Sequence, residues 1–344
     1  MRMLIRIGGV CVLAMQAYLT AAVADLVKTV DGKVEGRVSA MSPLEVTVSQ
    51  DGGAKKIPVN QIESISFDDE PALLRRAREA IAADRYEEAS KALENIKTDE
   101  IERPEILEDI EFYAALSDAK LALRGEVEIP GAGKRMRAFL SNHPKSYHYF
   151  EASETVGDLL VAMGQYARAR EYYESVGKAP WPEYKLRVSL AMGRVLLAEN
   201  KPDEALKYFQ QVLDAKAEGG RAVAQGSLAT VGKARCLLQL GKYDEAIPLA
   251  NAVIAEADPE DAELLGQAFL VLGIAHQKAG RFQDAMFALL RVDTMYSQNR
   301  DTHAEALAHL VAVFTALKKE DRARDARRTL EDEYGDTRWA KSIE

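Results

Sequence analysis

The sequence predicts a mostly α-helical solenoid that is preceded by a small all-β module. A signature recurs down most of the chain, in which a turn residue is followed by an aromatic residue or proline, then by alanine, then by a large apolar residue. Its alanines recur every 36–43 residues, a period typical of stacked helical units that bury their apolar faces against their neighbours. These alanines are Ala89, Ala132, Ala169, Ala205, Ala246, Ala285 and Ala323.

Composition supports the same fold class, and the net charge argues against one class of partner. Hydrophobic residues make up 47% of the 344 residues and aromatic residues only 7%, which is typical of stacked helices rich in alanine and leucine. The formal net charge is −9. Because a phosphate backbone demands a basic surface, we expect no nucleic-acid partner.

The first 24 residues have the pattern of a secretory signal peptide. Arg2 and Arg6 give a basic start, residues 7–19 are largely apolar, and residues 22–24 read Ala-Val-Ala, a small-x-small cleavage site. We therefore expect cleavage near Ala24 and a periplasmic or secreted mature protein. The sequence leaves two alternatives open, an uncleaved membrane anchor and a lipoprotein modified at Cys11.

After the leader, no segment is apolar enough to span a bilayer. We therefore expect no membrane span in the mature chain. Cys236 is then the one remaining cysteine and lies in an apolar run, where a buried small hydrophobic side chain is expected.

Residues 25–68 predict the β module. Four short runs rich in Val and Ile alternate in polarity and are separated by Asp-Gly turn signals, as β-strands do. These runs are residues 33–39, 44–49, 54–59 and 63–67. Their pattern resembles the small barrels of the Sm-like and SH3-like kind. A module of this size has a small core of its own, so we expect it to dock on the first helices.

Residues 71–344 predict helices almost throughout. Pro71 beside acidic residues is a helix-start signal. The predicted breaks between helices are residues 124–133, 142–146, 177–182, 217–220 and 258–259.

The units resemble tetratricopeptide repeats, which are antiparallel helix pairs stacked in a right-handed superhelix. The small residues expected in the first helix of a repeat are matched by Ala77, Gly157, Gly193, Ala234 and Gly273. The turn is matched by Gly164, Asn200, Gly241 and Gly280, and the small and large pair of the second helix by Ala169 with Tyr173, Ala205 with Phe209, Ala246 with Ala250, and Ala285 with Leu289. The resemblance implies about six to seven repeats. One unit departs from the pattern, because residues 125–133 lengthen the turn between its helices.

A search of the sequence for catalytic chemistry finds no specific motif. The five histidines do not have the spacing of a metal site. The carboxylates fall at helix starts and exposed helix positions, where the helix dipole and solvation explain them. We therefore expect no enzyme activity, no cofactor and no metal.

The resemblance places the functional surface on the concave face, which is lined by the first helix of each repeat. It puts there Arg187, Leu190, Arg194, Leu197, Arg235, Gln239, Gln267 and Gln277. The arginines could hold a partner's carboxylates; alternatively, they pair with local acidic residues such as Glu199. The carboxylate clamp of some family members is absent, since its positions hold Glu154, Asp158, Leu190, Arg194 and Arg235.

The sequence therefore predicts an extracytoplasmic scaffold that binds partner peptides or helices, in keeping with bacterial envelope proteins that carry such repeats. Two alternatives stay open at this point. One is an accessory subunit of an envelope enzyme or of a transport or energy-coupling complex, and the other is a self-assembling structural protein. The partner, the envelope process and the oligomeric state are left open by the sequence.

Overall fold

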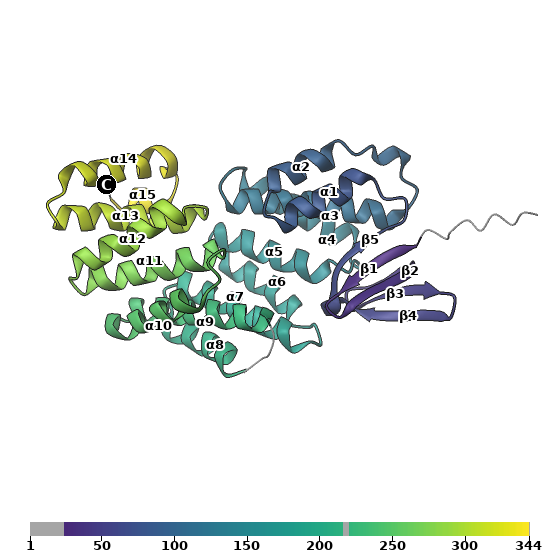
Figure 1. Cartoon of the computed structure of the whole chain (residues 1–344), viewed down its shortest axis with the longest axis horizontal. Helices are drawn as coiled ribbons and strands as arrows, with labels where there is room; N and C mark the ends of the chain where they lie inside the picture. The colour runs from purple at the N-terminus through teal and green to yellow at the C-terminus, as the bar shows by residue number, and fades with distance from the viewer. Residues whose placement is uncertain (1–23, 216–219, 344) are drawn as a thin grey trace, which may run out of the picture.

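The computed structural model describes residues 24–215 and 220–343. Within them, a five-strand sheet is followed by a solenoid of helices (Figure 1). The predicted signal peptide, apart from Ala24, lies outside the described residues, and so does most of the predicted break at 217–220.

The sheet is antiparallel, with strand order β4-β3-β2-β1-β5. Its strands are β1 (Asp25–Thr29), β2 (Gly32–Met41), β3 (Glu45–Gln50), β4 (Gly53–Pro58) and β5 (Ile62–Ser66). The four predicted strands are present as β2 to β5, but the sheet has a fifth strand, β1, which was not predicted. Val27 is the one apolar side chain of β1 that is fully buried, and it lies opposite Val34 and Ile65. A five-residue strand with a single such residue has no alternating pattern to detect.

The solenoid consists of antiparallel helix pairs, seven within the described residues, and a short last helix. The helices are α1 (Ala72–Ala82), α2 (Tyr86–Glu94), α3 (Pro104–Leu123), α4 (Ile129–Asn142), α5 (Tyr149–Ala162), α6 (Tyr166–Val176), α7 (Pro182–Ala198), α8 (Pro202–Asp214), α9 (Gly220–Gln239), α10 (Tyr243–Glu256), α11 (Ala262–Lys278), α12 (Phe282–Met295), α13 (Arg300–Ala316), α14 (Glu320–Tyr334) and α15 (Arg338–Lys341). The predicted break at 124–133 was too long, since α4 already begins at Ile129. Pro130 lies in the first turn of α4, where a helix tolerates proline.

The small residues of the repeat signature lie where the two helices of a pair approach each other most closely. A Cβ atom added to Gly157 of α5 would lie 2.4 Å from Cε1 of Tyr173 in α6, and one added to Gly193 of α7 would lie 2.6 Å from Cζ of Phe209 in α8. Such distances are well inside van der Waals contact. The predicted pairing of a small first-helix residue with a large second-helix residue is therefore confirmed, and Cys236 is buried as predicted.

The β module shares a core with the first helices, as predicted. Val27 and Ile65 of the sheet belong to the same buried cluster as Leu74 and Ala77 of α1 and Ile106 of α3. From there the helix pairs follow a curved path, so that α3 and α4 lie across from α13 at the other end (Figure 1). The curvature gives the solenoid a concave side that is lined by first helices.

Candidate functional site

Arginine–carboxylate pairs join the first helix α7 to the first helix α5, and α9 to α13. Arg187 of α7 pairs with Glu154 of α5. Further along the same two helices, Nη2 of Arg194 in α7 lies 3.7 Å from Oδ1 of Asp158 in α5. Both arginines of α7 therefore face acidic side chains of the preceding repeat.

The third pair spans a greater distance along the chain. Arg235 of α9 donates a hydrogen bond of 2.6 Å from Nη2 to Oε2 of Glu305 in α13. The carboxylate of Glu305 is 6% exposed and the side chain of Arg235 is about one third exposed. This pair is a structural tie as well as a part of the surface.

The surroundings keep all three arginines charged. Burial disfavours the charged forms of Arg187 and Arg194, but Glu154 and Asp158 more than compensate and raise the pKa of both guanidinium groups. For Arg235, the charge of Glu305 is the largest influence and raises the pKa. Arg194 is the most accessible of the three, with 55% of its side chain exposed. It also makes the longest ion pair, so it is the arginine most available to a partner.

The predicted glutamines extend the same surface. Gln239 donates from Nε2 to the backbone oxygen of Leu197 over 3.2 Å, and Gln277 faces Nδ1 of His309 over 2.6 Å. Gln267 lies 3.5 Å from Glu263. Amide side chains of this kind can donate and accept hydrogen bonds along an extended partner chain.

Leu190 departs from the prediction that it lies on the inner surface. Its side chain is 7% exposed and packs in a buried cluster with Ala205 and Phe209 of α8. Residues three apart share a helix face, so Leu190 lies beside Arg187 and is buried by its contacts in this cluster and not by its position in the helix. Leu197 packs partly against the same cluster, so it offers less surface than expected.

The acidic partner suggested for these arginines was also misassigned. Glu199 lies in the α7–α8 turn and pairs with Arg170 of α6 and with Lys201, at 3.0 Å from Nζ of Lys201. It therefore belongs to the outer side of its repeat, and the acidic residues that face the predicted arginines are Glu154, Asp158 and Glu305.

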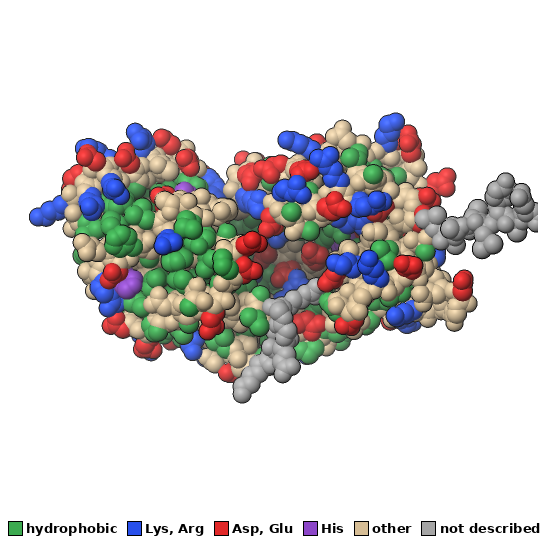
Figure 2. Space-filling model, in the orientation of Figure 1, with side chains coloured by type: hydrophobic (Ala, Val, Ile, Leu, Met, Phe, Trp, Pro, Cys, Tyr) green, Lys and Arg blue, Asp and Glu red, His purple; other side chains and the backbone are tan. Residues whose placement is uncertain are grey.

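Figure 2 shows a hollow in the middle of the molecule, over the region of α5 and α7, in which acidic and basic side chains gather. Glu263, at the start of α11, acts electrostatically on Arg194 and also on Tyr86 at the start of α2. Side chains from early, middle and late repeats thus come within electrostatic range of each other. The hollow is therefore the interior of the superhelix.

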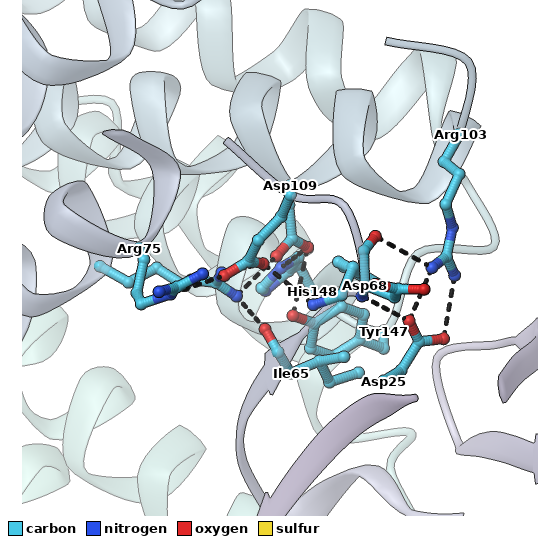
Figure 3. Close-up of polar contacts among 11 residues, drawn as sticks. Asp25, Ile65, Asp68, Arg75, Arg103, Asp109, Tyr147 and His148 are labelled. Carbon is cyan, nitrogen blue, oxygen red and sulfur yellow. Dashed lines mark hydrogen bonds and ion pairs between the residues drawn. The ribbon is translucent and has the colours of Figure 1, made fainter. Parts of the chain in front are cut away.

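A second polar cluster, which was not predicted from the sequence, lies at the junction of the β module and the solenoid. Asp25 of β1 is fully buried and accepts hydrogen bonds from the backbone of Val38 and Asp68, both of 2.7 Å. Arg103 donates to both oxygens of the same carboxylate, at 2.6 and 3.0 Å (Figure 3). Burial alone raises the pKa of Asp25, but Arg103 and the two backbone donors lower it below its ordinary value.

The junction continues around Asp109 of α3. Nε2 of His148 lies 3.1 Å from the Asp109 carboxylate, and Tyr147 donates to it over 3.2 Å (Figure 3). Arg78 of α1 lies 3.6 Å from Asp109 and also donates to the backbone oxygen of Ile65 in β5. The cluster fixes the sheet on the repeats, which is a structural role.

The described part of the chain has neither a metal-binding cluster nor a membrane-spanning helix. Residues 24–215 and 220–343 contain no group of three or more His, Cys, Asp or Glu side chains placed to hold a metal ion. No helix in the same residues is long and apolar enough to cross a membrane.

Comparison with known proteins agrees with this architecture. Residues 190–262 match the tetratricopeptide repeat family, and no curated protein matches the chain in sequence. Rap protein complexed with the competence and sporulation factor has a TM-score of 0.59 and 15% identity, over 79% of this chain and 78% of that one. The apo form of the quorum sensor NprR from B. thuringiensis has a TM-score of 0.55 and 15% identity, over 76% and 74%.

A tetratricopeptide repeat protein from Parabacteroides merdae is similar over 79% of this chain and 95% of that one, with a TM-score of 0.53 and 16% identity. At these identities the solved structures show the fold. Together with the repeat match over residues 190–262 and the stacked helix pairs, they show that the chain has the fold of tetratricopeptide repeat proteins, with a five-strand antiparallel sheet before its repeats.

Proposed function

We propose that this protein is an extracytoplasmic scaffold that binds a segment of a protein partner on the concave surface of its repeats. The observation that carries the proposal is the set of arginine–carboxylate pairs between first helices. Arg194 is its most accessible member, with 55% of its side chain exposed and an ion pair of 3.7 Å to Asp158. Such a guanidinium can exchange its carboxylate for one of a partner without leaving a buried charge behind.

The paired arrangement also indicates the chemistry of the partner. Glu154 and Asp158 lie on α5, and Arg187 and Arg194 face them from α7. A strongly acidic segment would meet the like charge of α5 and a strongly basic one the like charge of α7, which costs free energy. The surface therefore favours a segment that carries charges of both signs.

The similar solved structures support a binding role. One of them is Rap protein in complex with the competence and sporulation factor, and another is described as a quorum sensor. Tetratricopeptide solenoids present an extended concave surface to partners. In this protein the same surface carries the charged pairs.

Site-specific photo-crosslinking in the native cell tests this proposal. A photoreactive residue replaces Gln239, which is exposed on a first helix of the concave side, or Gln283, which is exposed on the second helix α12. The proposal expects one partner segment to be captured from position 239 and not from position 283. Equal capture from both positions, or none from 239, would contradict it.

The extracytoplasmic part of the proposal rests on the signal-peptide pattern of residues 1–24. Cell fractionation followed by N-terminal sequencing of the mature protein tests it. We expect a periplasmic or secreted protein that begins at Asp25. A chain in the cytoplasmic fraction that retains its N-terminal segment would contradict this part alone.

A further inference from the structure

The turn between α3 and α4 is longer than the corresponding turns of the other repeats. In the other six pairs of the described chain, three residues separate the first helix from the second, whereas residues 124–128 make five here. This is the lengthened turn that the repeat pattern singled out. Gly125 and Glu126 close the end of α3 through backbone hydrogen bonds to Ala122 and Leu121, and the turn extends beyond its own repeat.

The lengthened turn reaches the opposite end of the solenoid. Gly125 lies so close to Arg300, the first residue of α13, that an added Cβ atom would stand 2.1 Å from Cδ and 2.2 Å from Nε of Arg300. The φ angle of Gly125 is +79°, in the left-handed region that favours glycine. The backbone conformation therefore favours glycine at position 125, and an added side chain would force the Arg300 side chain to move away.

Each side of the contact is held firmly by its own arm of the solenoid. Arg300 pairs with Asp336 and lies over the ring of Tyr334, with 5.2 Å between Cζ and the ring centroid. On the other arm, Arg124 donates to the backbone oxygen of Asp84 over 3.0 Å and lies 4.6 Å from the ring centroid of Tyr86. Each arm thus holds its own arginine in place by contacts within that arm.

Little holds these surfaces together. Among the described residues, no hydrogen bond or ion pair joins residues 124–126 to residues 297–300 or 333–334. A polar pocket of about 270 Å³ lies between them, lined by Arg124, Gly125, Glu126, Ser297, Gln298, Arg300, Glu333 and Tyr334. Each arm brings one guanidinium and one carboxylate to this pocket, Arg124 with Glu126 and Arg300 with Glu333, but no ion pair between these described residues crosses it. A contact without a hydrogen bond or an ion pair across it is separated at little cost in free energy.

We propose that residues 124–126 and Arg300 form a clasp, a reversible contact that closes the solenoid into a ring around its charged interior and opens to admit a partner segment from the side. The clasp is a property of this chain and not of the repeat pattern, since it depends on the one lengthened turn. Its role in partner entry rests on the proposed function, whereas its existence does not.

Distance measurement by pulsed electron paramagnetic resonance tests the clasp. Spin labels are attached at Lys134→Cys in α4 and Arg322→Cys in α14, both exposed positions, while the native Cys236 is buried. We expect a single narrow distance distribution in this background. Gly125→Ala, which collides with Arg300, and Arg300→Ala, which removes the contact, should each give longer and broader distances.

Gly280→Ala is the matched control. Gly280 occupies the α11–α12 turn with a φ of +76°, and nothing lies within 4 Å of its added Cβ. It therefore carries the same backbone strain without a collision, and its distances should equal those of the parent. Unchanged distances in both clasp variants, or an equal change in Gly280→Ala, would overturn the clasp.

Partner entry is tested by bridging Glu126→Cys and Gln298→Cys with a bis-maleimide and repeating photo-capture from position 239. Capture that is lost on bridging, but kept with either single cysteine, supports the gating role. Equal capture with and without the bridge overturns it. If the unbridged protein captures nothing, the proposed function has failed, and the distance measurement still decides the clasp.

Discussion

Arg235 of α9 bonds Glu305 of α13, with 2.6 Å between Nη2 and Oε2, and so joins two first helices that are not neighbours in the stack. The pair shows how tightly the solenoid curves, because one side chain spans the width of α11. The predicted arginines therefore have two different roles. Arg235 holds the repeats together, whereas Arg194 is free enough to serve a partner.

Arg235→Ala should therefore destabilise the fold. It leaves the carboxylate of Glu305, which is 6% exposed, without its cation. The expected loss in the free energy of unfolding is about 1–3 kcal/mol, measured by urea denaturation. Arg235→Ala combined with Glu305→Gln should recover part of the loss, since the remaining amide is neutral. A double variant as unstable as the sum of the single variants would contradict this explanation.

Gly157→Ala should destabilise the packing of α5 against α6, the two helices of the third repeat. The new methyl group would meet the ring of Tyr173 at 2.4 Å, and overpacking of this kind costs about 1–3 kcal/mol. Gly226→Ala is the control, because nothing lies within 4 Å of that position in α9. There the better helix propensity of alanine should raise stability by up to about 1 kcal/mol. Thermal unfolding that moves in the same direction for both variants would contradict the packing argument.

Asp25→Asn should loosen the β module from the repeats. The change removes the charge that Arg103 faces across two hydrogen bonds at a buried position, and breaking a buried pair costs about 3 kcal/mol or more. Hydrogen exchange should then become faster in β1 and β5 and stay unchanged in α11 to α14. Lys56→Ala, which removes an exposed pair with Glu45 on the same module, should change exchange little. Equal effects of the two variants would show that the junction is not held by Asp25.

Stability should also depend on pH through His148. Burial by itself lowers the pKa of this histidine, but its hydrogen bonds to Asp109 and Glu151 raise the pKa above the ordinary value of 6.5. The histidine therefore contributes stability that is fully present below pH 6.5 and is lost as the pH rises through the higher folded pKa.

Urea unfolding at pH 6 and pH 8 measures this contribution. The parent protein should lose more stability between the two values than His148→Gln does. The comparison with the variant is needed because burial lowers the pKa of His276 and His309, so these two histidines contribute with the opposite sign. The same pH dependence in parent and variant would exclude His148 as the titrating group.

The repeats could be predicted from the sequence because their determinants are local. Ala169 and Tyr173 are four residues apart, and the same spacing recurs in Ala205 with Phe209 and Ala285 with Leu289. The junction could not be predicted, because Asp25 and Arg103 are 78 positions apart and the pair occurs once. The lengthened turn was visible in the sequence, but its contact with Arg300 follows from the curvature of the whole stack.

The inner surface was predicted in part for the same reason. Arg187, Arg194 and Arg235 lie along the first helices as expected, because helical periodicity fixes their side. Their partners Glu154, Asp158 and Glu305 come from other repeats, and no sequence pattern records which helices face each other. Leu190 shares a helix face with Arg187 and Arg194, but it is buried in a cluster with Ala205 and Phe209, and that contact between helices is not recorded in the sequence pattern.

The central claim is that the concave surface binds a partner segment through its exposed arginine. The most direct measurement is the dissociation constant of the segment captured from position 239, for Arg194→Glu and for Arg170→Glu. Arg170 also pairs with a carboxylate, Glu199, but on the outer side of its repeat. The account predicts binding that is roughly tenfold weaker for Arg194→Glu, or about 1.4 kcal/mol, and unchanged for Arg170→Glu. Equal affinities for the two variants would contradict it.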